Sequence, residues 1–168
     1  QFLKTASDIS DVFPEGSWAL IGGLAVSYYA NPAVTVGVDV FFDNIHYDIN
    51  EIISAMKVHG WNSRPLHFPH RQRGLPRKGV AIEKDRPLTV VDILFAGRDK
   101  FLQDAVRDCE FAKLSDGQSI PIVSANNLIV MKSLVGRDKD LDDIADLYRT
   151  LGDRLDYDYI SNKIEELE

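Results

Sequence analysis

The sequence predicts a mixed α/β domain of the α+β type, in which helices flank a mixed sheet and the C-terminal portion is helical. Strand-like and helix-like segments alternate over the first two-thirds of the chain, and helical segments close it. The chain has 168 residues, 45% hydrophobic and 27% charged, which is enough to bury one core. We therefore expect a single domain over residues 1–168, with an α/β core at 1–123 and C-terminal helices at 124–168.

The first sixty residues contain two predicted strands among helices. Apolar spacing and breaking residues predict, in order, a helix at 2–13, a strand at 18–21, a helix at 24–30, a strand at 34–42 and a helix at 48–59. Pro14 and Pro32 end the first two helices. Asp48 is the expected N-cap of the third, which Gly60 closes.

The middle of the chain consists of a proline-containing segment followed by strands and a helix. Prolines break residues 62–78, which predicts a loop or an irregular hairpin. Strand-like runs follow at 79–83 and 88–96, then a helix at 99–107 and short strands at 109–113 and 119–123.

The last third is helical throughout. Ser124 is a suitable N-cap for a helix through residue 134, and Gly136 separates it from a second helix at 138–151. A final helix is expected at 157–167.

Charge is unevenly distributed along the chain. The net charge of −7 argues against broad nucleic-acid binding. Residues 62–78 nevertheless contain five basic residues and no acid, whereas residues 137–168 contain eleven acids against five basic residues. A local basic loop on an acidic body is able to meet a phosphate-bearing ligand without attracting polyanions generally.

The cysteine content and the hydropathy bear on the compartment. Cys109 is the only cysteine, so no internal disulfide can form, and we expect a cytoplasmic protein. No apolar stretch is long enough for a membrane span, and the start has no signal-peptide pattern. Since the chain begins with Gln1 rather than Met, a missing targeting segment remains open.

A pair of glycines lies between a predicted strand and a predicted helix. Gly22 and Gly23 allow a tight turn, and the N–H groups at a helix start can face an anion. The further glycines of a dinucleotide fingerprint and the Gly-Lys-Ser/Thr ending of a P-loop are absent. A turn needed only for packing is the alternative.

Two aspartates interrupt otherwise apolar strands. Asp39 lies within residues 34–42 and Asp92 within 88–96. Acids are seldom buried without a partner or a metal, and two acids on neighbouring strands are suited to a hard cation such as Mg²⁺. Each acid taken alone also fits a strand end, capped by backbone or paired with an arginine. Together they favour a site.

These features resemble the nucleotidyltransferase superfamily. Residues 20–26 (LIGGLAV), followed by Thr35 and Asp39, are similar to its opening motif, in which a Gly-Gly or Gly-Ser turn precedes a strand carrying Asp-x-Asp. Residues 90–95 (VVDILF) are similar to the later strand that carries a third Asp. Lys132 and residues 137–144 (RDKDLDDI) resemble the Lys…Arg-x-Lys-Asp-x-x-Asp helices of AbiEii-type toxins and related small bacterial nucleotidyltransferases.

The resemblance implies roles for individual residues. Asp39 and Asp92 would act as catalytic metal ligands for Mg²⁺, and Gly22 and Gly23 would face the triphosphate of an NTP. Lys132 and Lys139, with Arg137 between them, would approach the nucleotide phosphates or stabilise the fold near them. A solvated, salt-bridged helix face is the equal alternative, because the acids at 138, 140, 142 and 143 lie among these basic residues.

The sequence departs from the family pattern at one catalytic position. Gly37 stands where the first Asp of Asp-x-Asp is expected. Residues two apart in a strand share a face, so the two aspartates of Asp-x-Asp can bind a metal ion jointly. Gly37 supplies no ligand.

Two functions that follow from the resemblance remain open, and a third does not depend on it. One is Mg²⁺-dependent transfer of a nucleotidyl group from an NTP to an acceptor hydroxyl, with RNA, a protein or a small molecule as the acceptor. The other is a catalytically degenerate module that acts by nucleotide or partner binding, for example in a toxin–antitoxin system. A plain interaction domain using the acidic C-terminal helices is a third, which predicts no metal-dependent nucleotide affinity.

Overall fold

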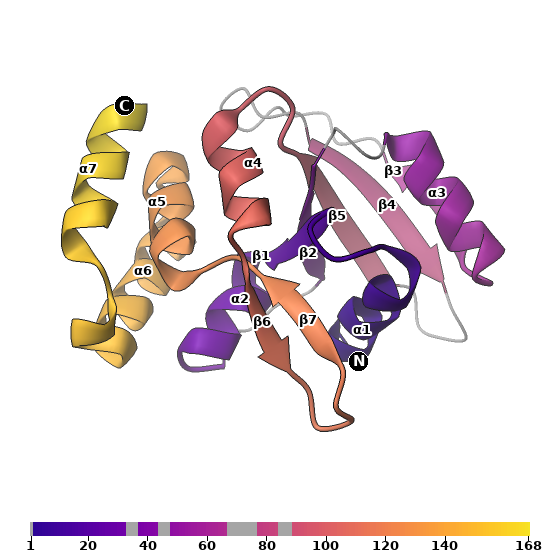
Figure 1. Cartoon of the computed structure of the whole chain (residues 1–168), viewed down its shortest axis with the longest axis horizontal. Helices are drawn as coiled ribbons and strands as arrows, with labels where there is room; N and C mark the ends of the chain where they lie inside the picture. The colour runs from indigo at the N-terminus through magenta and orange to yellow at the C-terminus, as the bar shows by residue number, and fades with distance from the viewer. Residues whose placement is uncertain (1, 33–36, 44–47, 67–76, 84–88) are drawn as a thin grey trace.

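A mixed sheet forms the centre of the protein. The computed structural model describes residues 2–32, 37–43, 48–66, 77–83 and 89–168. Within them the strands form a seven-stranded sheet in the order β3-β4-β5-β2-β1-β7-β6 (Figure 1). The strands are β1 (Trp18–Ile21), β2 (Val38–Phe42), β3 (Asn62–Leu66), β4 (Arg77–Glu83), β5 (Thr89–Phe95), β6 (Glu110–Lys113) and β7 (Ser119–Ile122).

Helices surround this sheet. In the described residues they are α1 (Phe2–Val12), α2 (Gly22–Tyr29), α3 (Ile49–Val58), α4 (Lys100–Arg107), α5 (Ala125–Val135), α6 (Asp138–Leu151), the short 3₁₀ helix η1 (Gly152–Arg154) and α7 (Tyr157–Leu167). Figure 1 shows α5, α6 and α7 grouped together, away from the β3–β4 hairpin. The helix α5 packs against both α6 and α7, and α6 also contacts α2. The α+β class with a helical C-terminal part is therefore confirmed.

The described sheet is mixed, with two parallel and four antiparallel strand pairs. The strand β2 is parallel to β5 and antiparallel to β1, while β1 is parallel to β7. The remaining pairs, β3–β4, β4–β5 and β6–β7, are antiparallel. Each of the three central strands β5, β2 and β1 pairs with a strand on both sides. Hydrogen bonds along both edges therefore hold their common surface in place.

The two faces of the central strands differ in burial. On β2, Val38, Val40 and Phe42 are completely buried, and the ring of Phe13 packs edge-on against Phe42 with centroids 4.9 Å apart. Because successive side chains in a strand point to opposite faces, Asp39 lies on the other face. One face thus belongs to the apolar core, and the other carries a half-buried carboxylate.

Several helix ends follow the predicted capping chemistry. The Asp48 side chain accepts hydrogen bonds from the N–H groups of Asn50 and Glu51, and the Glu51 carboxylate completes a capping box. The Ser124 hydroxyl accepts a hydrogen bond from the N–H of Asn127 at 3.3 Å. Both predicted N-caps are confirmed.

Some predicted boundaries change. The second helix begins at Gly22, two residues earlier than expected, and η1 was not anticipated. Residues 62–66 form β3, which pairs antiparallel with β4, so of the two forms predicted for residues 62–78, a loop or an irregular hairpin, the hairpin is confirmed in the described residues. Pro65 fits there because β3 is the edge strand of the described sheet, where a missing N–H costs least. The basic residues at 71 and 73 lie outside the described residues. Among the described segments, none of the helices combines the length and apolar character that a bilayer crossing requires.

Candidate functional site

Two predicted metal ligands lie side by side on the central strands. In the parallel pair β2–β5, Asp39 is the register partner of Asp92. Register partners on adjacent strands point to the same face and lie about 4.8 Å apart across the strands. Both carboxylates are half-buried. The fold therefore brings together two acids, Asp39 and Asp92, that are 53 positions apart in the sequence.

The glycine turn lies directly beside this pair. Ile21, the last residue of β1, is the register partner of Asp39, and Gly22 begins α2. Gly22 has a φ of +71°, and a Cβ at this position would lie only 2.7 Å from Asp39 Cγ and 2.8 Å from its Cβ. A glycine is thus required at position 22 for two reasons: the backbone there is left-handed, and the Asp39 carboxylate occupies the space that a Cβ would need.

This contact gives the glycine pair a physical role that the sequence did not reveal. The start of α2 concentrates N–H groups and the positive end of the helix dipole. Asp39 lies against that helix start, so its negative charge is favoured there. A phosphate approaching the same helix end would meet both the N–H groups and any cation held by Asp39.

Gly37, the position at which the resemblance leads us to expect an acid, lies just before β2. It is half-buried and immediately precedes β2, two residues before Asp39. If the alternation of β2 extends by one residue, position 37 shares the face of Asp39 and Asp92. This face therefore carries two carboxylates from β2 and β5, with no side chain at the position of a third.

These residues fit a shared Mg²⁺ ion. Mg²⁺ commonly binds one or two protein carboxylates and completes its shell with water and substrate phosphates. Asp39 and Asp92 provide those two carboxylates on one face. Within the described ranges no group of three His, Cys, Asp or Glu side chains is suited to a metal, so an ion cage made entirely of protein ligands is not present there.

Lys132 is part of a buried ion-pair cluster. Its Nζ lies 2.7 Å from Asp143 Oδ2 and 3.3 Å from Asp140 Oδ1, and its side chain is 9% exposed. Asp140 and Asp143 are buried as well. The basic and acidic residues of this region therefore form ion pairs, but the cluster lies inside the α5–α6 contact rather than on a solvated helix face.

Arg137 extends the cluster to the surface. Its Nε donates a hydrogen bond to Asp140 Oδ2 at 2.7 Å, and its Nη2 donates one to Asp140 Oδ1 at 3.0 Å. Lys139 is exposed in the first turn of α6 and does not join these ion pairs in the described part of the chain. Among the basic residues of the motif, Arg137 is thus the one that has both a fixed geometry and access to solvent.

The electrostatics connect this cluster with the aspartate pair. The hydrogen bond to Asp140 raises the pKa of the Arg137 guanidinium, and the charge of Asp39 adds to that effect. Burial alone would raise the pKa of Asp140, but Arg137 and Lys132 outweigh it and lower the pKa below its ordinary value. Arg137 therefore lies within electrostatic range of Asp39, although the two are far apart in sequence.

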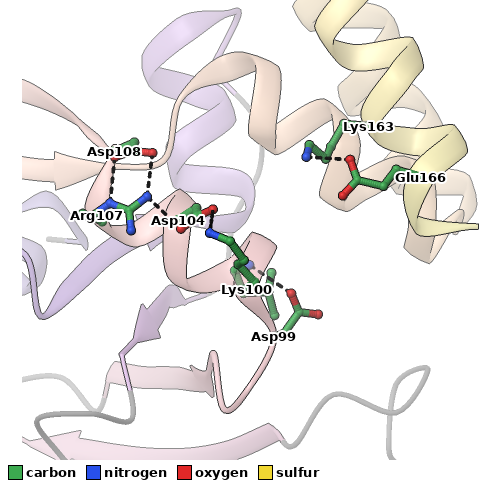
Figure 2. Close-up of polar contacts among 8 residues, drawn as sticks. Asp99, Lys100, Asp104, Arg107, Asp108, Lys163 and Glu166 are labelled. Atoms are coloured by element: carbon green, nitrogen blue, oxygen red, sulfur yellow. Dashed lines mark hydrogen bonds and ion pairs between the residues drawn. The ribbon is translucent and has the colours of Figure 1, made fainter.

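Two further sets of ion pairs, one on α4 and one on α7, differ in character from the Lys132 cluster. Asp104 pairs with Lys100 at 3.0 Å and with Arg107 at 2.7 Å, and on α7 Lys163 pairs with Glu166 (Figure 2). Lys100 and Arg107 are largely exposed. Such pairs within one helix are largely solvated and contribute little, so neither set is a candidate site.

A cavity of about 890 Å³ lies away from the aspartate pair. It is lined by α1, α2 and the β6–β7 hairpin, and its floor includes Leu20 and Ile122. Since Leu20 precedes Ile21, the register partner of Asp39, the cavity lies on the opposite face of the sheet. Its position therefore adds nothing to the metal and phosphate chemistry of the site.

Comparisons with known proteins identify the fold. No protein-family model and no curated protein matches the sequence. The protein ANT(2")-Ia, solved in complex with adenylyl-2"-tobramycin, has a similar structure with a TM-score of 0.51 and 10% identity, covering 99% of this chain and 95% of that one. A protein from H. pylori described as a nucleotidyltransferase gives a TM-score of 0.58 and 16% identity, covering 98% of this chain and 72% of that one. The chain therefore shares the fold of nucleotidyltransferases.

Proposed function

We propose that this protein transfers a nucleotidyl group from an NTP to an acceptor hydroxyl, with Mg²⁺ as its cofactor. The observation that carries the proposal is the register pairing of Asp39 with Asp92 on one face of the sheet, beside the start of α2. Two carboxylates and a helix start in one place suit a magnesium–phosphate ligand. The shared fold with nucleotidyltransferases supports the same reaction class.

The chain's own residues have separate tasks in this proposal. Asp39 and Asp92 would hold Mg²⁺, which offsets the charge of the triphosphate and polarises the phosphorus under attack. Gly22 keeps the start of α2 accessible by leaving room for Asp39, and Gly23 follows it within the same first turn. Lys139 is exposed and available to a phosphate, whereas the Lys132 ammonium group already contacts two carboxylates.

A catalytically degenerate module is the second candidate, and Gly37 favours it. Two carboxylates suffice to bind an ion together with substrate phosphates, but activation of an attacking hydroxyl generally requires a further ligand or base. A protein that binds Mg²⁺ and NTP without transfer would act through nucleotide or partner binding, as in a toxin–antitoxin pair.

The first test is NTP binding, because it requires no knowledge of the acceptor. Isothermal titration calorimetry with each of the four NTPs, with and without Mg²⁺, should show binding that requires the metal. Asp39→Asn and Asp92→Asn should each abolish the metal-dependent part. Asp158→Asn, which changes an exposed acid on α7, is the matched control and should leave binding unchanged. Binding that ignores Mg²⁺ or survives both substitutions would overturn the assignment.

Acceptor assays then separate the two candidates. ANT(2")-Ia was solved with an adenylylated tobramycin, so tobramycin is a defined small-molecule acceptor to assay with labelled ATP. A tRNA pool and a protein lysate represent the other acceptor classes. Label transfer to any of them that is lost in Asp39→Asn supports the enzyme; Mg²⁺-dependent binding without transfer supports the degenerate module.

A further inference from the structure

The cavity of about 890 Å³ among α1, α2 and the β6–β7 hairpin has an apolar floor. On β7, Ile120 and Ile122 are two residues apart and share a face of the sheet, and Leu20 of β1 is the register partner of Ile122. All three side chains line the cavity and are almost completely buried. Small-molecule sites usually have volumes of about 300–1,000 Å³ and mainly apolar linings. The floor therefore suits the apolar body of a small molecule.

The helix α1, which packs against β7, turns a polar side toward this cavity. Ser7, Asp8 and Asp11 are spaced so that a helix carries them on one side, and all three line the cavity. The core-facing side of α1 carries Ala6 and Ile9, which are 0% and 1% exposed. The sequence of α1 thus places two carboxylates and a hydroxyl group over the apolar floor.

Two polar groups of the lining have hydrogen-bonding capacity left over. Ser7 is 7% exposed, and its hydroxyl group forms no hydrogen bond with any residue that the structure describes. The Gln118 side-chain nitrogen donates a hydrogen bond to Asp11 Oδ1 at 3.3 Å, whereas Gln118 Oε1 is buried and has no partner among the same residues. Buried polar groups are nearly always hydrogen-bonded. A ligand that donates hydrogen bonds beside α1 would satisfy both oxygens.

The charges around the cavity favour a cation. The lining contains three carboxylates, those of Asp8, Asp11 and Asp116, and two ammonium groups, those of Lys4 and Lys113. The Asp8 side chain is 16% exposed, whereas that of Lys4, its ion-pair partner at 3.5 Å, is 78% exposed. An ion pair with so exposed a partner is weak. The Asp8 carboxylate therefore remains available to an ammonium group inside the cavity.

We propose that this cavity binds a small amphipathic amine, in which a protonated amino group is joined to an apolar body. The ammonium group lies beside α1, where Asp8 and Asp11 supply negative charge. Ser7 Oγ and Gln118 Oε1 accept its hydrogen bonds, and the body lies on the apolar floor. The site is separate from that of the proposed nucleotide transfer, because the floor and Asp39 lie on opposite faces of the sheet.

Three matched probes test this assignment: phenethylamine, phenethyl alcohol and hydrocinnamate. They share one apolar body and differ in a head group that is cationic, neutral or anionic. Each is titrated into isotope-labelled protein, and the amide chemical shifts in NMR spectra give both the affinity and the location of binding. We expect the amine to bind roughly tenfold more tightly than the alcohol, and hydrocinnamate to bind most weakly. The largest shifts should fall in α1 and in the β6–β7 hairpin.

Variants of the two acids on α1 test the charge. Asp8→Asn and Asp11→Asn should each weaken binding of the amine roughly fivefold and leave binding of the alcohol unchanged. A general loss of structure would weaken both probes alike. Asp158→Asn, in an exposed acid on α7, is the matched control and should change neither affinity. Asp39→Asn should also leave amine binding unchanged, because the two sites are separate.

Ser7→Ala separates binding from stability. The substitution removes a buried hydroxyl group that has no partner in the described chain and places a better helix former in α1, so the midpoint of urea unfolding should rise. The same variant should bind the amine about fivefold more weakly, because one acceptor is lost. Weaker binding by a more stable protein cannot result from partial unfolding.

Several results would overturn the proposal. One is equal affinity for the three probes, and another is an amine affinity that neither Asp8→Asn nor Asp11→Asn lowers. Loss of amine binding in Asp39→Asn would place the amine at the candidate nucleotide site instead. Spectra that no probe changes would likewise refute the assignment. The proposed function is decided separately, by Mg²⁺-dependent binding of NTP.

Discussion

Gly22 and Asp39 are in contact across the β1–β2 pair, and this contact explains why a glycine begins α2. A side chain at position 22 would overlap the Asp39 carboxylate, and the backbone there is left-handed. The metal-ligand candidate and the glycine turn are therefore one structural unit. The sequence suggested each of them separately.

Gly22→Ala should damage the site more than the fold. The left-handed backbone costs a non-glycine residue about 1–3 kcal/mol, and the new methyl group must also displace Asp39. We expect a loss of Mg²⁺–NTP binding together with a lowered midpoint in urea unfolding. Gly117→Ala is the control, because Gly117 has a similar φ of +86° with nothing within 4 Å of its would-be Cβ. It should show the backbone cost and full binding; equal binding loss in both variants would refute the contact with Asp39 as the cause.

Lys132→Met should destabilise the protein strongly. The substitution leaves Asp140 and Asp143 with one cation fewer in a buried setting. Removing one partner from a buried ion cluster costs about 3–5 kcal/mol. Urea unfolding followed by circular dichroism measures this directly. Lys100→Met, which removes an exposed partner of Asp104 on α4, is the matched control and should change the midpoint little. Similar midpoints for the two variants would show that the Lys132 cluster is not an important source of stability.

Acid should weaken the protein partly through Asp140. The folded protein lowers the pKa of Asp140 below its ordinary value of 3.8, because Arg137 and Lys132 stabilise the carboxylate. The unfolded chain then binds more protons in this range, so the stability contributed by Asp140 is fully present above pH 3.8 and is lost as the pH falls through the lower folded pKa. The free energy of unfolding of the unmodified chain should therefore fall more steeply between pH 4 and pH 2 than that of Asp140→Asn. Parallel curves would contradict this linkage.

The sequence predicted the sheet well where local patterns decide it. Asp39 and Asp92 interrupt runs of β-branched and apolar residues, so both strands were placed within a few residues of β2 and β5. The N-caps Asp48 and Ser124 were found because capping is a local interaction. The sequence left residues 62–78 open between a loop and an irregular hairpin, because Pro65 breaks strands in most settings and is acceptable in β3 at the edge of the described sheet.

The contacts around the candidate site required the tertiary structure. The register of β2 against β1 and β5 brings Gly22, Asp39 and Asp92 together, and no spacing in the sequence gives that register. Burial of Lys132 likewise depends on how α5 packs against α6. The sequence placed Lys132 equally well near phosphates or on a solvated face, because a helical charge pattern does not distinguish a buried ion pair from an exposed one.

Gly37→Asp is the variant that separates an enzyme from a degenerate module. The new carboxylate would lie two residues before Asp39 on the same face, at about 6.6 Å along the strand, and would join Asp39 and Asp92 around Mg²⁺. We expect NTP binding to require less Mg²⁺, measured as a lower Mg²⁺ concentration at half-maximal binding. Gly37→Asn, which has the same size without the charge, is the control and should not show this gain.

Transfer activity of the Gly37 variants then has a clear meaning. If labelled nucleotide reaches an acceptor with Gly37→Asp but not with the unmodified chain, the natural protein binds nucleotide and has lost its chemistry at this single position. If both transfer at the same rate, Asp39 and Asp92 suffice, since an added ligand on their face brings nothing further. If the unmodified chain transfers the label and Gly37→Asp does not, the substrate occupies the space at position 37, because a side chain there would exclude part of it.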